Sequence, residues 1–475
     1  MVIGRLTSEI GRGVSDLGEA MSLSDPVVRL GVTGLARAGK TVFITGLVAN
    51  LLNRGRMPGL RAVSQGLIEG VWLQPQPDDT VPRFDFEAHL AALTGDDPRW
   101  PQSTRSVSEL RLSFRVARHG MLAGMLGGFR GPRRLHLDIV DYPGEWLLDL
   151  GLMDKSYAAW SAEVLDRIER RREAADYLAR IAGLDAAAPL DETVARGLAE
   201  GFTAYLQAAR NAGYYDCTPG RFLMPGELAG SPVLTFGPLP QAEARRGSLY
   251  AEMARRFDAY RREVVRPFFR DHFARIDRQV VLVDALGAIH SGPQAVEDLR
   301  RAMTEILAAF RPGRNDFLTR ILQGRRVERI LFAATKADHL HHTQHPRLTA
   351  FLEALLQDAR ARADFAGART AAMSIAALRA TVEEALSHDG RSVDAVRGRL
   401  LDSGRQAALY PGALPEDPMR LLSPAREGAE CWLDADYRVM NFAPARMTLR
   451  AGEGPPHIRL DRAAEFLFGD RLMGE

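Results

Sequence analysis

Short apolar runs with strand-like spacing recur along this chain, and longer segments with helical spacing lie between most of them. The strand-like runs are predicted at 27–33, 108–116, 134–140, 279–286, 329–334 and 370–376. The run at 279–286 is almost wholly apolar, which is typical of a parallel strand buried on both faces. The runs at 108–116 and 134–140 alternate, and they predict a hairpin at the edge of the sheet.

Helix-compatible runs follow three of these strands, at 41–52, 295–310 and 348–362, and a last helix is expected at 460–468. This order of strands and helices predicts an α/β fold, with a mostly parallel sheet and helices on both faces. Six prolines interrupt the stretch from 53 to 102, so that stretch is expected to be irregular.

A helix-periodic and highly charged stretch, without a strand-like run, separates the two groups of strands and predicts a large helical insertion. We therefore expect an N-terminal amphipathic helix at 1–25, a first part of the α/β domain at 26–145, the insertion at 146–277, a second part of the α/β domain at 278–385, and a C-terminal extension packed on that domain at 386–475.

The first 25 residues carry apolar side chains at helical spacing, from Ile3 to Met21. A helix docked on the rest of the chain is the favoured interpretation. The alternative is a helix lying on a membrane surface, but the polar face mixes acidic with basic residues, and helices of that kind are usually basic there.

Composition narrows the class of protein. Of 475 residues, 46% are hydrophobic and 26% charged, and the formal net charge is only +2, which argues against a nucleic-acid partner. No apolar run approaches the roughly 20 residues of a membrane span. The chain has only two cysteines, which fits a reducing cytoplasm and not a disulfide-stabilised secreted protein.

The clearest chemical signal lies between the first strand and the first helix. Residues 34–41 read Gly-Leu-Ala-Arg-Ala-Gly-Lys-Thr, a complete phosphate-binding loop (P-loop) in the strand–loop–helix setting that it requires. Its backbone amides and the helix N-terminus would bind phosphate, Lys40 would reach the β- and γ-phosphates, and Thr41 would ligate Mg²⁺. The expected contacts come from Gly34, Ala36, Arg37, Ala38, Gly39, Lys40 and Thr41.

A second signal stands at the end of the strand at 134–140. Asp141-Tyr-Pro-Gly144 matches the Asp-x-x-Gly element that senses a γ-phosphate. Asp141 would act on Mg²⁺ through water, and the Gly144 amide would face the γ-phosphate. Thr104, with Ser103 and Ser106 as alternatives, is the candidate for a switch residue that closes on Mg²⁺.

A third signal follows the strand at 329–334. Thr335-Lys336-Ala337-Asp338 resembles the guanine-binding Asn-Lys-x-Asp element, with threonine in place of asparagine. Asp338 would accept guanine N1–H and N2–H together, and the Lys336 stem would cover the base. The alternative is a plain helix N-cap. The segment that contains Ser374 and Ala376 would supply a backbone amide to the guanine oxygen.

These motifs, in this order, resemble the translation-factor-like class of GTPases. Together with 100–105, the Asp-Tyr-Pro-Gly-Glu-Trp string at 141–146 and 456–461, they resemble the YcjX-like family of bacterial P-loop proteins over nearly the whole chain. The resemblance implies a stress-associated cytoplasmic GTPase with a helical insertion, which uses GTP or GDP and Mg²⁺.

Two residues bear on catalysis. Glu145 occupies the place where many GTPases carry a water-positioning glutamine, so it would either polarise water or repel charge. The P-loop with Arg37 is similar to that of guanylate-binding, dynamin-like proteins, where the arginine acts in cis on the transition state. The alternative is a solvated or salt-bridged Arg37 at the mouth of the pocket.

Four histidines, at 339, 341, 342 and 345, follow Asp338. A solvated loop is favoured over a zinc site, because zinc requires convergent ligands and usually cysteine or carboxylate company.

The motifs predict a slow, Mg²⁺-dependent GTP-hydrolysing switch. Its insertion would sense a partner, which is either an unknown protein or a second copy of the chain bound through the nucleotide-binding domain. An ATPase, with Asp338 only capping a helix, and a nucleotide-binding interaction module with little turnover remain as alternatives.

Overall fold

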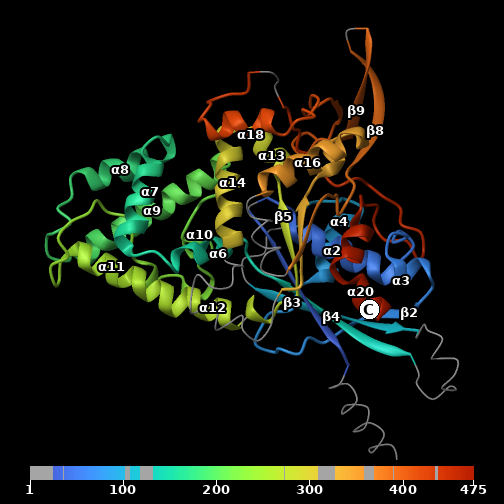
Figure 1. Cartoon of the computed structure of the whole chain (residues 1–475), viewed down its shortest axis with the longest axis horizontal. Helices are drawn as coiled ribbons and strands as arrows, with labels where there is room; N and C mark the ends of the chain where they lie inside the picture. The colour runs from blue at the N-terminus through green and yellow to red at the C-terminus, as the bar shows by residue number, and fades with distance from the viewer. Residues whose placement is uncertain are drawn as a thin grey trace, which may run out of the picture.

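The computed structural model describes residues 25–35, 37–101, 107–117, 132–271, 273–308, 327–357, 368–388, 390–433 and 437–474. Ala36, Thr104 and nearly all of the predicted N-terminal helix at 1–25 lie outside these residues. The described part consists of a central sheet flanked by helices, a helical lobe to one side and a protruding hairpin (Figure 1). None of its helices combines the length and the apolar character needed to cross a membrane.

A seven-stranded sheet has the order β2-β3-β4-β1-β5-β6-β7. Neighbouring strands from β4 to β7 run parallel, while β3 is antiparallel to both β2 and β4. The α/β fold with a mostly parallel sheet is therefore confirmed. The strands are β1 Val27–Gly34, β2 Ile68–Gln74, β3 Ser108–Val116, β4 Arg133–Asp141, β5 Arg278–Val283, β6 Arg329–Ala334 and β7 Arg369–Ser374.

The edge of the sheet differs from the prediction. β3 and β4 do form the predicted hairpin, but β2 covers β3 and is itself the edge strand. The stretch from 53 to 102 is thus not irregular throughout, since it also contains α3 Arg61–Ser64 and α4 Phe86–Thr94. A bulge between Ile68 and Gly70 interrupts the alternation of inward and outward side chains along β2. Most side chains of β2 are half-buried, so its sequence shows little of the apolar pattern that marks a strand.

The two faces of the sheet belong to different cores. Val280 and Leu282 of β5 pack with α2 Lys40–Asn53 and the C-terminal helices, whereas Val281 and Val283 pack with α14 Pro293–Ala308 and α16 His345–Leu355. This double burial explains the apolar sequence of β5. The strand ends at Val283, earlier than predicted, because Asp284 accepts a hydrogen bond from the Gly287 amide and caps α13 Ala285–Ser291.

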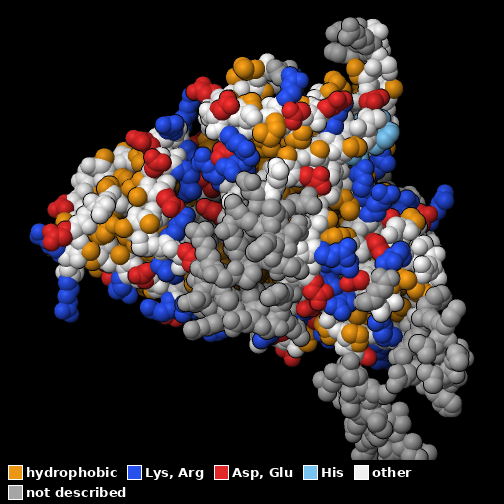
Figure 2. Space-filling view, viewed as in Figure 1, with side chains coloured by type: hydrophobic (Ala, Val, Ile, Leu, Met, Phe, Trp, Pro, Cys, Tyr) orange, Lys and Arg blue, Asp and Glu red, His pale blue; other side chains and the backbone are white. Residues whose placement is uncertain are grey.

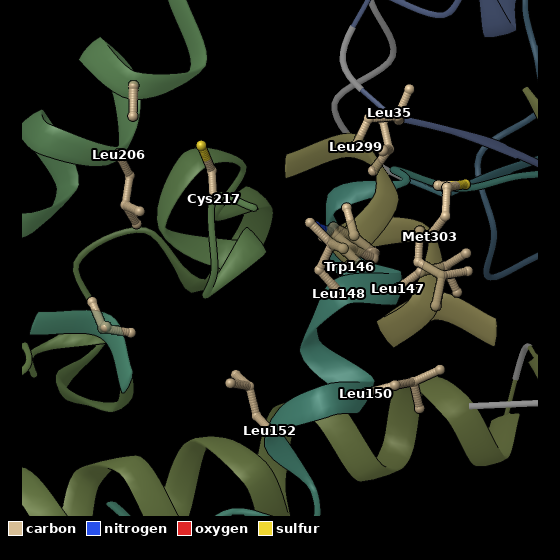
Figure 3. Packing of buried hydrophobic residues seen from close by; sticks show 14 of the residues in the cluster. Leu35, Trp146, Leu147, Leu148, Leu150, Leu152, Leu206, Cys217, Leu299 and Met303 are labelled. Atoms are coloured by element: carbon tan, nitrogen blue, oxygen red, sulfur yellow. The ribbon is translucent and has the colours of Figure 1, made fainter. Parts of the chain in front are cut away.

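The lobe between β4 and β5 is helical. Its helices are α6 Glu145–Leu148, α7 Tyr157–Ile168, α8 Ala175–Ala182, α9 Glu192–Ala212, α10 Gly220–Leu223, α11 Leu249–Tyr260 and α12 Arg266–Asp271. Their apolar side chains join the core on the α14 face of the sheet. Figure 3 shows Trp146 to Leu148 of α6 gathered with Leu299 and Met303 of α14.

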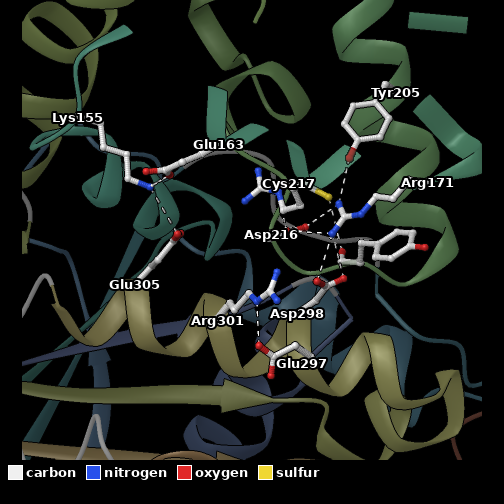
Figure 4. A network of polar contacts seen from close by, with 12 residues as sticks. Lys155, Glu163, Arg171, Tyr205, Asp216, Cys217, Glu297, Asp298, Arg301 and Glu305 are labelled. Carbon is white, nitrogen blue, oxygen red and sulfur yellow. Dashed lines mark hydrogen bonds and ion pairs between the residues drawn. The ribbon is translucent and has the colours of Figure 1, made fainter. Parts of the chain in front are cut away.

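A buried ion network also joins this lobe to α14 (Figure 4). The Arg171 guanidinium donates to both Asp216 oxygens, at 2.9 and 3.0 Å, and to Asp298 of α14 at 3.1 Å. Burial and the nearby Asp216 raise the pKa of Asp298. Because a buried charge without a partner is costly, the shared arginine holds the lobe and α14 in one arrangement.

The C-terminal part adds a second sheet that the sequence pattern did not predict. β8 Thr381–His388, β9 Arg391–Arg399 and β10 Gln406–Leu409 are antiparallel, in the order β10-β9-β8. The chain continues through α18 Met419–Arg426, α19 Leu460–Ala464, a π-helical turn at Glu465–Gly469 and α20 Asp470–Met473. Asp470 pairs with Arg278 of β5 at 2.8 Å and with Arg329 of β6 at 2.9 Å, so the end of the chain returns to the central sheet.

Candidate nucleotide-binding site

The P-loop lies between β1 and α2, as the motif requires. Arg37 and Gly39 both have left-handed backbones, with φ of 66° and 75°. Gly39 is the N-cap of α2, and no side chain caps that helix end. The first amides of α2 are therefore directed at the loop, which is the usual arrangement at an anion site.

A cavity of about 400 Å³ opens over this loop. Segments that are far apart in the sequence form its walls, and they include three of the predicted motifs. The lining includes Gly34, Arg37, Ala38, Gly39, Lys40, Thr41, Glu145, Arg210, Thr335, Lys336, Asp338, Ala376 and Ala377.

Lys40 connects the P-loop to the end of β4. Its ammonium lies 2.9 Å from Asp141 Oδ1 and donates to the Tyr142 carbonyl at 3.0 Å. Asp141 is only 1% exposed, and neither of its carboxylate oxygens makes a hydrogen bond within the described residues. A buried carboxylate in this state has unused acceptor capacity.

Gly144 brings the Asp-x-x-Gly segment against the P-loop. A Cβ atom placed on Gly144 would lie 2.1 Å from the Gly34 carbonyl oxygen. Only glycine permits this approach, so the Gly144 backbone lies directly beside the start of the phosphate loop.

The predicted base-recognition loop forms the other end of the cavity. Asp338 is 4% exposed, and its Oδ2 accepts a hydrogen bond from the Ala380 amide at 2.8 Å. Lys336 has a left-handed backbone, and its ammonium pairs with Asp284. The Thr335 hydroxyl donates to the Val283 carbonyl at 3.4 Å, so this threonine braces the loop against β5.

The segment after β7 differs in detail from the prediction. The Ser374 hydroxyl is buried and donates to the His345 carbonyl at 3.2 Å. The Ala376 amide is already used, because it donates to the Ile458 carbonyl at 3.1 Å. Ala377 also lines the cavity, and its amide makes no hydrogen bond within the described residues, so Ala377 replaces Ala376 as the candidate amide for a base oxygen.

The helical lobe contributes a residue that the sequence analysis missed. Arg210, near the end of α9, lines the cavity, and its guanidinium lies 3.3 Å from Glu145 Oε1. The exposed Arg37 donates to the Asn211 carbonyl at 3.3 Å. No local motif surrounds Arg210, and only the folded arrangement of α9 over the P-loop brings it to the site.

A scan against protein-family models matches residues 28–472 to the YcjX-like family, DUF463. The chain belongs to the YcjX-like family. It is 38% identical over 462 residues to the Ras-like GTPase YcjX of Escherichia coli, covering 94% of this chain and 96% of that relative. It is 35% identical over 475 residues to the Ras-like GTPase YcjX of Shewanella oneidensis, covering 94% and 95%.

In this YcjX-like chain, the Asp-Tyr-Pro-Gly-Glu-Trp string also contacts β5 and the helices α10 and α12 of the lobe. The Tyr142 hydroxyl donates to Gln279 Oε1 of β5 at 2.6 Å. The Arg221 guanidinium lies 3.2 Å from the centre of the Trp146 ring, and Phe268 meets that ring edge-on at 5.2 Å. Trp146 is thus in direct contact with residues of α10 and α12.

Proposed function

We propose that this protein binds and hydrolyses GTP, with Mg²⁺, as a slow molecular switch. The observation that supports this best is that one cavity is lined by the P-loop, by Glu145 beside Gly144 and by the Thr-Lys-x-Asp loop. A phosphate end and a base end in one cavity suit a nucleotide. Both relatives are named Ras-like GTPase YcjX, which supports the same activity.

We propose that Asp338 selects guanine. One carboxylate oxygen is held by the Ala380 amide, which orients the group toward the cavity that it lines. A guanine base would present N1–H and N2–H to this carboxylate, and its oxygen to the Ala377 amide. Adenine has no such pair of donors, so the buried carboxylate would lose hydrogen bonds on binding ATP.

Mg²⁺ fits the donors at the phosphate end. The Asp141 carboxylate is buried beside the Lys40 ammonium and makes no hydrogen bond among the described residues, and the Thr41 hydroxyl stands at the start of α2. Oxygen ligands of this kind suit Mg²⁺, which keeps several waters and binds phosphate oxygens. When bound, the ion would neutralise phosphate charge. Thr104, the third predicted contact, lies outside the described residues.

We propose Arg210 as the group that stabilises the transition state. Glu145 follows Gly144, whose backbone lies against the P-loop, and the pair with Glu145 holds the guanidinium at the γ-phosphate end. The ion pair occupies the Glu145 carboxylate, so its proposed role is to position Arg210. Arg37 remains a second candidate, because its contact with Asn211 holds it at the same helix end.

The helical lobe is the proposed sensor of a protein partner or a second copy of the chain. Its contacts through Arg210, Arg221 and Phe268 reach the phosphate-sensing segment from one side. The stress-associated role stays a prediction from the family resemblance.

Asp338→Asn should convert the base preference from GTP to xanthosine triphosphate, because the asparagine amide can donate to the additional xanthine oxygen. We expect GTP affinity to fall by about 10²-fold while xanthosine triphosphate gains affinity. Equilibrium binding of the two nucleotides measures this, with Glu384→Gln on β8 as the control carboxylate. GTP affinity equal to wild type in Asp338→Asn would remove Asp338 from base recognition.

A further inference from the structure

Three ionisable side chains converge outside the nucleotide cavity, at the base of the hairpin β8–β9. His341 and His342 follow the base-recognition loop, and Glu383 lies on β8, 41 residues after His342. One ligand atom from each lies within 4.8 Å of the other two. Figure 2 shows histidine side chains at the surface beside this hairpin, next to a group of Lys and Arg side chains.

The donor atoms have the spacing of metal ligands. Glu383 Oε2 lies 2.8 Å from His342 Nδ1 and 3.7 Å from His341 Nε2. Two ligands of a tetrahedral Zn²⁺, each about 2.1 Å from the ion, are about 3.4 Å apart. The observed distances lie on either side of that value, so small side-chain movements would place all three atoms around one ion. The 3.7 Å separation is too long for a hydrogen bond.

Surrounding groups orient these ligands. His341 Nδ1, the nitrogen that would face away from the ion, lies 3.0 Å from the Thr343 hydroxyl and 3.5 Å from Asp394 Oδ2. Glu383 Oε1 accepts from the His342 amide at 3.2 Å and lies 3.5 Å from Arg379 Nη2. In protein metal sites, the ring nitrogen of a histidine that does not bind the metal commonly contacts a carboxylate, which fixes the orientation of the ring.

We propose that His341, His342 and Glu383 form a binding site for a divalent transition metal ion, with Zn²⁺ as the best match. Two imidazoles and one carboxylate are a donor set that this metal accepts, and three protein ligands leave a fourth position open. His342 and Glu383 also line a cavity of about 410 Å³ together with Arg379, Arg459 and Arg462. Water, or an anion bound by these arginines, would complete the coordination.

The ion would join two segments that already meet at Asp338. The Ala380 amide and the Thr381 hydroxyl, at the start of β8, bind the Asp338 carboxylate and carbonyl respectively. A bond from Glu383 through the metal to the two histidines would add a second connection between β8 and this loop. Zn²⁺ should therefore raise the unfolding temperature of the protein.

Zn²⁺ titration of the full-length, chelator-treated protein tests the site by calorimetry. We expect one ion per chain in wild type and no measurable site in the double variant His341→Ala, His342→Ala. Glu383→Gln, which keeps its size and hydrogen bonding, should also lose the site. Asp394→Asn should weaken binding by about 10–100-fold, because it acts only through His341. His89→Ala on α4 is the matched control and should bind as wild type does.

Thermal unfolding with and without Zn²⁺ gives a second measure, with stabilisation expected in wild type and absent in Glu383→Gln. Zn²⁺ binding of equal strength in wild type and Glu383→Gln would overturn the proposal, as would a wild-type protein that binds no Zn²⁺.

Discussion

Replacing Lys40 by alanine should abolish nucleotide binding. Within the described residues, its ammonium is the only cationic partner of Asp141, and Lys40 lines the cavity beside the P-loop amides. In the complex it would leave Asp141 for the β- and γ-phosphates. Removal of one member of such a charged contact costs about 2–5 kcal/mol, so the Kd for GTP should rise by about 10²-fold or more.

The control for this variant must separate binding from folding. Lys40→Ala leaves the buried Asp141 without a cation, which lowers the free energy of unfolding. The double variant Lys40→Ala, Asp141→Asn removes that cost and should still show a Kd for GTP raised by about 10²-fold or more. Lys155→Ala, in the helical lobe, removes a lysine paired with Glu163 and should bind GTP as wild type does. Unchanged GTP affinity in a folded Lys40→Ala protein would contradict the P-loop assignment.

Replacing Arg210 by alanine should lower kcat for GTP by about 10³-fold with little change in GDP affinity. Charge on the γ-phosphoryl oxygens is redistributed as the bond to the leaving group breaks, and a guanidinium at that end favours the transition state over bound GTP. Loss of kcat without loss of binding is what removal of such a group produces. Single-turnover phosphate release measures the chemical step directly.

Two further variants make the assignment specific. Arg196→Ala changes an exposed arginine on the same helix α9 and should hydrolyse GTP at the wild-type rate. Arg37→Ala tests the arginine inside the P-loop in the same assay. If Arg37 and not Arg210 is the catalytic arginine, the large loss of kcat will appear in Arg37→Ala and not in Arg210→Ala. Wild-type turnover in Arg210→Ala, measured at several protein concentrations, would exclude Arg210 as the catalytic arginine.

The parts of the site that follow short, local patterns could be predicted from the sequence. The P-loop, Asp141 with Gly144, and Thr335 with Asp338 each stand at the end of a strand whose apolar run marks it clearly. The carboxyl ends of parallel strands meet at one edge of the sheet. Motifs that follow such strands are therefore expected to lie together in the fold.

The remaining features depend on contacts between distant segments. Arg210 pairs with Glu145 only because the C-terminal end of α9 lies at the cavity over the P-loop. The charged sequence of α9 does not indicate such a role. The same holds for Glu383, which meets His341 and His342 only once β8 has formed. β2 was missed because its bulge and half-exposed side chains hide the alternation. The sequence also could not show that the Ala376 amide is unavailable to a base, because its hydrogen-bond acceptor, the Ile458 carbonyl, lies 82 residues further along the chain.

Competition between nucleotides tests the central claim most directly. Labelled GTP is bound to the wild-type protein with Mg²⁺ and displaced by unlabelled GTP or by ATP. A guanine site built on Asp338 predicts that ATP competes about 10²-fold or more less well than GTP, because adenine leaves the buried carboxylate unpaired. Equal displacement by ATP and GTP would contradict it and would favour an ATPase in which Asp338 only holds the loop.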